Sequence, residues 1–306
     1  MSKTKLTMQC RVRAYLAQRR ALGYRLRIEG QLLLNFARFA DRSGHSGPAT
    51  KGLMLRWATL PTQADPLYKA RRLEIVGTFA KHQIMLEPLT ELPPRHVLGP
   101  AHRRKPAHLF TMGQIRQLLA RAGRMPGKLR SHTYRTLIGL LACSGLRISE
   151  ALALTLEDTD LEHGVLTIRE SKYRLTRLVP LHPSAVAALK RYHRKRQRLY
   201  PQAQPFFLSE QGYRLAYSTV RTTFRKLASG MVPASGRRHV RLHDLRHTFA
   251  CRVLLRWERS KGRALGRLAI LSRYLGHAHV TDTYWYLTAT PALLAEAGRS
   301  FQLPSL

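Results

Sequence analysis

Acidic residues are scarce in this sequence: only 17 of the 306 residues are Asp or Glu, against 53 Lys or Arg, so the formal net charge is +36. A chain this basic repels itself unless a polyanion accompanies it. The first hundred residues carry a net charge of +11 and the remaining 206 carry +25. We therefore expect both parts to touch the same long polyanion, most simply nucleic acid. The alternatives are a basic surface for acidic lipid, or mere solubility.

Cysteine pairs and long apolar runs are missing as well. Cys10, Cys143 and Cys251 form no CxxC pair, so we expect neither a disulfide framework nor a cysteine-rich zinc site. No stretch approaches the ~18 consecutive apolar residues of a membrane span. The N-terminus lacks the apolar core of a secretory signal; it is Arg-rich, as a mitochondrial transit peptide would be, but the basic bias continues along the whole chain. We expect a cytoplasmic, nucleoid-associated protein without a membrane partner.

Metal and nucleotide signatures are also absent. The sequence has neither GxxxxGK[ST] nor GxGxxG, the glycine-rich loops that cradle phosphates. Among its 14 histidines, His243 and His247 have the i, i+4 spacing with which one helix face can ligate a metal. Spacing suggests no third ligand, and Arg246 between them would disfavour a cation. We therefore expect no metal and no cofactor.

Apolar residues at helical spacing predict a first part built from helices. Gly23 closes the first apolar run in the manner of a C-cap, and Pro66 suits the first turn of a helix. We expect a compact helical domain over residues 1–87. Its predicted helices span Met8–Leu22, Glu29–Ala40, Lys51–Leu60 and Asp65–Gln83.

Helix breakers and basic residues are concentrated in residues 88–106. Proline and glycine at this density cannot continue a helix, and the basic residues suit a strap lying on phosphates. An ordinary solvated linker is the alternative, and we place the domain boundary here. The breakers and basic residues are Pro88, Pro93, Pro94, Gly99, Pro100 and Pro106, with Arg95, Arg103, Arg104 and Lys105.

The second part, residues 107–290, is predicted to combine helices with a small sheet. Helices are expected over Met112–Gly123 and Tyr134–Cys143. Val165–Arg169 and Leu178–Leu181 are typical of short strands, so a β-hairpin or three-stranded sheet is expected, with a basic turn at Glu170–Arg177. The fold class that follows for the chain is mainly α with a small β-sheet.

A further helix is predicted over Pro183–Tyr200. It carries the basic run Lys190–Arg198, interrupted by Tyr192 and His193. A solvated helix face explains this run at least as well as a specific contact does.

Four segments of the second part combine cationic and proton-transferring residues. In SGLRISEALAL, a helix end and a glycine turn precede Arg147, which stands where the next helix starts. SKYRLTRLVPL, at the predicted hairpin tip, offers Lys172. HDLRHTFA places His243 and Arg246 at i, i+3, on one helix face. The fourth segment is LGHAHVTDTYWY, which ends at residue 286.

Together and in this order, the four segments resemble the tyrosine recombinase (phage integrase) family. The resemblance covers Ala107–Thr290 closely and implies a mixed α/β catalytic domain. The helical first domain and the basic linker look like the core-binding arrangement of that family. The partners implied are double-stranded DNA target sites and further recombinase protomers, in a homo- or hetero-tetramer on DNA.

The resemblance implies a nucleophile and two charge-stabilising residues. Tyr286 would attack the scissile phosphodiester and form a 3′-phosphotyrosine, which conserves the bond energy for religation. Arg147 and Arg246 would hold the nonbridging oxygens and stabilise the growing negative charge. Their fixed cations would do the work that other nucleases give to magnesium.

Three further residues take proton-transfer or hydrogen-bonding roles by the same resemblance. Lys172 would protonate the departing 5′ oxygen, His243 would assist proton transfer at the tyrosine, and His277 would donate a hydrogen bond to the phosphate. The turn around Lys172 is Lys-Tyr-Arg rather than the more usual glycine-bearing form. The alternatives to Lys172 are Arg169, Arg174 and Arg177, otherwise interpreted as backbone phosphate contacts.

Acidic and histidine neighbours of these residues are interpreted as supporting groups. Glu150 and Asp158 resemble acidic positions of the family, and we interpret them as arginine-orienting or capping groups rather than acid catalysts. His247 and His279 are interpreted as structural or surface residues.

The choice between Tyr284 and Tyr286 depends on where a helix begins. On one unbroken helix Tyr284, seven residues after His277, would share its face and Tyr286 would not. Thr281-Asp282-Thr283, however, is an N-cap type cluster that predicts a new helix there. Periodicity then favours neither, and the family interval from histidine to nucleophile matches Tyr286.

The function implied is a site-specific DNA recombinase or integrase, and we expect it to belong to a phage, transposon or other mobile element. The alternatives are a non-catalytic DNA-binding accessory protein on the same fold and a type IB topoisomerase-like relaxase. In the tail 291–306, Pro291 predicts a short helix with Leu293, Leu294 and Ala297 on a small apolar face, too short to be stable alone. By the resemblance we expect it to dock on a neighbouring protomer; folding back on its own chain is the alternative.

Overall fold

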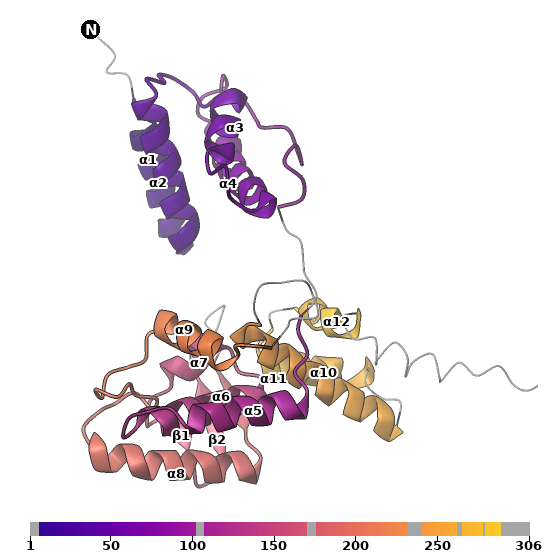
Figure 1. Ribbon diagram of the computed structural model, residues 1–306. Helices are drawn as coiled ribbons and strands as arrows, with labels where there is room; N and C mark the ends of the chain where they lie inside the picture. The colour runs from indigo at the N-terminus through magenta and orange to yellow at the C-terminus, as the bar shows by residue number, and fades with distance from the viewer. Residues whose placement is uncertain are drawn as a thin grey trace, which may run out of the picture. The chain divides into compact units, whose positions relative to one another are not determined.

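The chain forms two compact units, Met1–Arg104 and Lys105–Leu306. The structure is a computed structural model that describes residues 6–101, 107–169, 176–231, 240–261, 265–277 and 279–288 (Figure 1). Lys172, the linker residues 102–106 and the tail 291–306 lie outside this described part. No helix within it is long and apolar enough to cross a membrane.

The described part of the first unit is helical, as predicted. Three of its helices begin at a residue whose side chain accepts a hydrogen bond from the first turn: Thr7, Thr50 and Asp65. Such caps satisfy N–H groups that have no partner within the helix. The helices are α1 (Met8–Ala21), α2 (Arg27–Arg42), α3 (Lys51–Thr59) and α4 (Pro66–Gln83), close to the predicted bounds.

Aromatic rings fill the core of this unit. Phe36 contacts both Trp57 and Phe79 edge-on, with ring centroids 5.4 and 6.5 Å apart. The buried Arg72 places its guanidinium 3.8 Å from the Trp57 ring and donates a hydrogen bond to the Trp57 carbonyl at 2.6 Å. Its charge is thereby stabilised by a ring face and a carbonyl rather than by a carboxylate.

The Pro-rich segment that follows α4 packs against the helices of the first unit. The Glu91 N–H donates to the carbonyl of Ala49 at 2.9 Å, and the Glu91 carboxylate accepts from the N–H of Lys51 at 2.7 Å. Pro93 lies so close to Gly77 of α4 that a Cβ there would come within 3.1 Å of its ring. Up to residue 101 the expected linker is thus part of the first unit, and its contact with DNA stays a prediction.

The second unit is a mainly helical body with one small sheet, which is the predicted fold class. Thr111 caps its first helix in a reciprocal capping box with Gln114. The helices are α5 (Met112–Gly123), α6 (Arg130–Ser144), α7 (Ile148–Ala153), α8 (Pro183–Leu199), α9 (Tyr217–Leu227), α10 (Leu242–Lys261), α11 (Leu268–Leu275) and α12 (Thr281–Thr288), with the 3₁₀ turn η1 (Leu265–Arg267) before α11.

The sheet has three antiparallel strands in the order β1-β2-β3. The strands are β1 (Thr159–Asp160), β2 (Val165–Ile168) and β3 (Arg177–Pro180). In the β2–β3 pair, Ile168 faces Arg177 and Leu166 faces Val179. This register fixes Arg177 at the start of β3, beside α11.

Two apolar clusters divide the second unit. The larger one joins α5, α6, α8, α9 and the sheet. The smaller one is formed by α10, α11 and α12 and includes Leu254, Leu271, Leu275 and Tyr286. Figure 1 shows α10–α12 at one side of this unit and α8 along another, with α5 and α6 between them. The candidate site lies where the smaller cluster meets the end of α6.

Candidate active site

Two helices end at the site with left-handed glycines. Gly145 closes α6 with φ 63°, and Gly276 closes α11 with φ 68°. A Cβ at Gly145 would lie 2.5 Å from Phe249, and one at Gly276 would lie 2.5 Å from Arg177. Only glycine adopts this backbone at no cost and fits this space. The turns leave carbonyls at two helix C-termini directed at the same region.

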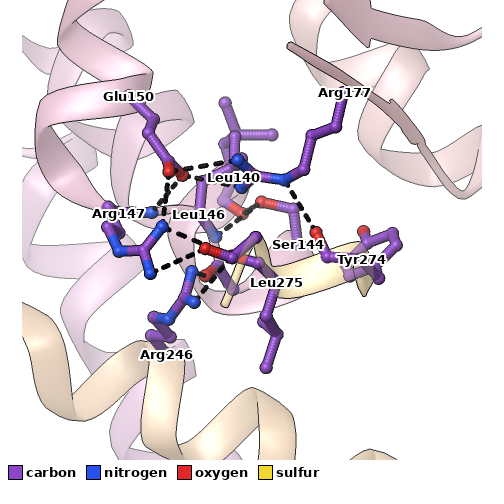
Figure 2. Close-up of polar contacts among 11 residues, drawn as sticks. Leu140, Ser144, Leu146, Arg147, Glu150, Arg177, Arg246, Tyr274 and Leu275 are labelled. Carbon is purple, nitrogen blue, oxygen red and sulfur yellow. Dashed lines mark hydrogen bonds and ion pairs between the residues drawn. The ribbon is translucent and has the colours of Figure 1, made fainter. Parts of the chain in front are cut away.

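Those carbonyls hold the two arginines predicted from the sequence. Arg246, on α10, donates to the carbonyl of Gly145 at 2.8 Å and to that of Leu275 at 2.7 Å. Arg147, the residue before α7, donates to the carbonyl of Gly276 at 3.0 Å and, more weakly, to that of Leu275 at 3.5 Å. Figure 2 shows both guanidiniums pointing at the Leu275 carbonyl. Helix C-termini favour cations, so the two like charges are held side by side.

Glu150 orients Arg147 from the other side. Its buried carboxylate accepts from Arg147 Nη1 at 2.8 Å and from the Arg147 N–H at 3.0 Å. It also accepts from Arg177 Nη2 at 2.9 Å, while Arg177 Nε donates to the carbonyl of Tyr274 (Figure 2). Burial alone would raise the pKa of Glu150, but the hydrogen bond and charge of Arg177 and the hydrogen bonds of Arg147 outweigh it and lower that pKa.

Tyr286 lies in the same site, on α12, with only 3% of its surface exposed. Its ring contacts His247 edge-on at 5.3 Å between centroids and stacks with His277 at 6.0 Å. Burial raises the pKa of its phenol, and the charge and hydrogen bond of Arg246 oppose that rise. In turn, burial lowers the pKa of Arg246 to about 10, with the Tyr286 phenol opposing the shift and Arg147 adding to it. Arg246 therefore stays protonated at neutral pH.

The predicted break between His277 and the tyrosines is confirmed. The described backbone leaves the helix at Gly276 and enters α12 at Thr281. On α12, Tyr286 turns into the α10–α12 cluster, whereas Tyr284 is 48% exposed. The structure thus brings Tyr286, and not Tyr284, beside the arginines.

The two predicted histidines flank the arginines. His277 is hydrogen-bonded through Nδ1 to the hydroxyl of the buried Thr283 at 2.8 Å. Burial, followed by the charges of Arg246 and Arg147, lowers the pKa of His277 to about 4. His243 is more exposed, yet desolvation by its surroundings and the charge of Arg246 also lower its pKa to about 4. Both rings are neutral at pH 7, so each can donate or accept one proton.

The alternatives to Lys172 occupy different surroundings. Lys172 and Arg174 lie outside the described residues. The side chain of Arg177 is 11% exposed and bound to Glu150, which does not fit a phosphate contact. Arg169 pairs with the buried Asp158, which Thr155 also supports, although 61% of the Arg169 side chain is exposed. Glu150 and Asp158 therefore both hold arginines, as interpreted from the sequence.

Two further groups lie at the site that the sequence did not place there. His247, interpreted as structural or surface, stands between His243 and Tyr286, with its ring centroid 4.7 Å from that of His243. The other is the Leu275 carbonyl, which accepts a hydrogen bond from both arginines. Because it is a backbone group, no residue type in the sequence marks it. Within the described residues, no group of three or more His, Cys, Asp or Glu side chains could hold a metal ion.

The arrangement suits chemistry on a phosphodiester. Two guanidiniums that are charged at neutral pH lie beside one buried phenol, and neutral imidazoles border both. Such a cluster can bind an anion, stabilise added negative charge on it and activate a hydroxyl next to it. Phosphoryl transfer to a tyrosine requires these three functions together.

Comparison with known proteins supports this reading. The sequence pattern of the phage integrase family matches residues 109–292. The chain belongs to the phage integrase family of tyrosine recombinases. Members of this family are DNA strand-transferring enzymes. The recombinase is 40% identical to the integrase/recombinase y4rB of Sinorhizobium fredii, covering 97% of each chain. It is 32% identical to the tyrosine recombinase XerC of Thermodesulfovibrio yellowstonii over about half of each chain, 50% and 48% respectively.

Solved structures show the same fold. The recombinase matches the integrase of transposon Tn1549, solved in complex with transposon right end DNA, with a TM-score of 0.70 and 18% identity. The match covers 96% of this chain and 98% of the other. The order of elements expected from the four sequence segments is therefore that of a known recombinase fold.

Proposed function

We propose that this recombinase cuts and rejoins double-stranded DNA at specific sites through a phosphotyrosine on Tyr286. The observation that carries this proposal is the placement of the Tyr286 phenol beside the guanidinium of Arg246, with Arg147 bound to the same Leu275 carbonyl. A phosphate entering here would meet a hydroxyl and two cations at once. The kinship with integrases, one of them solved on transposon DNA, supports a role in a mobile element.

In the proposed reaction, the Tyr286 oxygen attacks the scissile phosphorus and its proton passes to a neighbouring base, His243 being the candidate. The bond from phosphorus to the 5′ oxygen breaks, and Lys172 supplies a proton to that oxygen. The phosphate is then linked to Tyr286 at the 3′ end, and attack by another strand's 5′ hydroxyl reverses the step.

Each supporting residue has a role in this scheme. Arg147 and Arg246 neutralise the charge that grows on the nonbridging oxygens, and their carbonyl contacts hold them in place before DNA arrives. His277, neutral and fixed by Thr283, donates a hydrogen bond to one of those oxygens. No step needs a metal ion, since the two arginines supply the positive charge.

The partners proposed are two DNA duplexes and a ring of four protomers, acting on nucleoid DNA in the cytoplasm. The helical first unit and its Pro-rich segment would bind one side of the target duplex.

The tail 291–306 would dock on a neighbouring protomer. Deleting Pro291–Leu306 should then spare binding of one half-site and reduce assembly on paired sites; normal recombination by the truncated protein would end this idea.

The experiment that tests the function is incubation with a nicked duplex carrying the sequences that flank the gene, in EDTA. A covalent protein–DNA band on a denaturing gel is the expected result. Cleavage that strictly requires magnesium, with DNA binding unaffected, would overturn the mechanism. Relaxation of a plasmid without the target site would instead indicate a topoisomerase-like activity.

A further inference from the structure

The helix α8 carries an accumulation of positive charge that the proposed reaction does not use. It contains six Lys or Arg residues and no Asp or Glu. Arg196 is fully buried and donates to the carbonyls of Ala203 and Pro205, where it fixes the chain after the helix. Of the other five, Lys190, Arg191, Arg194 and Arg198 are exposed and Lys195 is half-buried.

Within the part of the chain that the structure describes, none of these five cations has a carboxylate partner. Among the described residues, every ion pair found involves arginines or a histidine of other elements, such as Arg147, Arg169 and Arg177. Lys190, Arg194 and Arg198 are spaced four residues apart, which places like charges on one face and destabilises the isolated helix. Lys190, Arg194 and Arg198 form what we call the α8 stripe. Among the described residues its cations have no carboxylate partner, so the stripe destabilises the fold.

The stripe is remote from the candidate active site. Leu189 and Tyr192 anchor α8 in the larger apolar cluster, against α6. The site is built from the end of α6 with α7, α10, α11 and α12. Figure 1 shows α8 separated from α10–α12 by α5 and α6. A straight duplex seated on the arginines Arg147 and Arg246 is therefore separated from α8 by the body of the unit.

The surface beside the stripe is hollowed. A depression of about 680 Å³ runs between α8 and the β1–β2 region. Lys190, His193 and Arg194 line it from the helix, and the His193 ring stacks on Phe206 with the two planes 5° apart. Glu162 also lines it, as one carboxylate against the two cations Lys190 and Arg194.

We propose that the α8 stripe is a second DNA-binding surface, which takes the phosphate backbone of a duplex segment other than the one being cut. Lys190 and Arg198 lie eight residues apart, about 12 Å along the helix. Each strand of a duplex presents a phosphate about every 3.4 Å of its axis, so the stripe spans three to four phosphates. The contact is electrostatic and independent of base sequence.

This inference rests on the DNA binding of the proposed function and goes beyond it. A recombinase must bring distant DNA segments together, and a cationic surface behind the catalytic face would retain a second segment. Neither Tyr286 nor any residue of the cleavage site takes part.

A capture experiment on the full chain tests the proposal. Protein is bound to a biotinylated duplex on beads, and a fluorescent duplex of unrelated sequence is added. The variant is Lys190→Gln/Arg194→Gln/Arg198→Gln, and the matched control is Lys190→Arg/Arg194→Lys/Arg198→Lys, which keeps the charge. The first variant should remain on the beads like wild type but capture about tenfold less second duplex. Its capture should also depend less on salt, with a slope of log binding against log salt smaller by about 2.7.

Each outcome decides between interpretations. Capture that is unchanged in the Gln variant, or equally lost in the charge-preserving one, overturns the proposal, as does a wild type that captures no second duplex. Loss of bead retention by the Gln variant would place α8 on the first duplex and overturn it too. A wild type that fails to bind the beads would instead contradict the proposed function. Thermal unfolding confirms folding, because removing like charges should not lower the melting temperature.

Discussion

The rings of His277 and Tyr286 stack with their centroids 6.0 Å apart and their planes 22° apart. The two residues belong to separate backbone elements, because α11 ends before His277 and α12 begins at Thr281. The turn between these helices therefore sets the position of the phenol relative to Arg147 and Arg246. This geometry makes the positions of both side chains testable.

The titration of His277 should report on the arrival of DNA. Without DNA its pKa is about 4, because burial and the arginine charges favour the neutral ring. A bound phosphate adds negative charge, so the pKa should rise on binding. Histidine NMR resonances recorded against pH with and without duplex would measure both midpoints. A midpoint near the ordinary 6.5 in the free protein, or no shift on binding, would contradict this assignment.

The same lowered pKa has a consequence for stability. The unfolded chain binds a proton at His277 below about pH 6.5, whereas the folded chain does so only near pH 4. The contribution of His277 to the free energy of unfolding is therefore greatest above pH 6.5. It decreases as the pH falls from 6.5 towards 4.

Replacement of Glu150 should weaken the fold at neutral pH. Glu150→Gln removes one partner from a buried pair, which costs roughly 3 kcal/mol. The lowered pKa of Glu150 means that its carboxylate stabilises the fold above the ordinary pKa of 4.5 and stops doing so as the pH falls below it. In denaturant unfolding, the difference in the free energy of unfolding between wild type and variant should therefore be larger at pH 7 than at pH 4. The exposed Glu162→Gln is the control, and an equal effect of both variants would argue against the role of Glu150.

Arg246→Lys should slow cleavage by about 10²- to 10³-fold while DNA binding changes little. A single ammonium cannot donate to the carbonyls of Gly145 and Leu275 and also serve the phosphate in the planar geometry of a guanidinium. Single-turnover formation of the covalent complex measures the rate. Arg256→Lys, exposed on the same helix, should leave it unchanged, and similar rates for both variants would contradict the account.

A change of the leaving group distinguishes the role of Lys172 from the roles of its basic neighbours. Lys172→Ala should cleave an ordinary phosphodiester slowly, because the 5′ oxygen then departs without a proton. A substrate with sulfur at that bridging position needs no protonation, so its cleavage should be restored. Arg174→Ala should change the cleavage rates of both substrates by the same factor. If Arg174→Ala instead shows the selective rescue, the general acid is Arg174 or depends on it.

The sequence predicted local features well. Gly145 and the position of Arg147 indicated a helix end, a turn and a new start, and Thr281-Asp282-Thr283 indicated the start of α12; both are confirmed. Helix α9 was not predicted although Val220, Phe224 and Leu227 have helical spacing. That omission could have been avoided from the pattern alone.

Long-range features were not accessible in the same way. Arg177 was considered a phosphate contact, but the pairing of β3 with β2 brings it against Glu150 and Tyr274. No local pattern encodes that approach, since the three residues lie on a strand and two helices far apart in the chain. The shared Leu275 carbonyl is a backbone group, so no residue type marks it.

The central claim, that Tyr286 is the nucleophile, is tested most directly by covalent capture on a nicked substrate. Wild type and Tyr284→Phe should both leave a protein–DNA band on a denaturing gel, because Tyr284 is exposed and outside the cluster. Tyr286→Phe should bind the same DNA and leave none, since only the attacking hydroxyl is removed. A covalent band from Tyr286→Phe together with its loss in Tyr284→Phe would contradict the account.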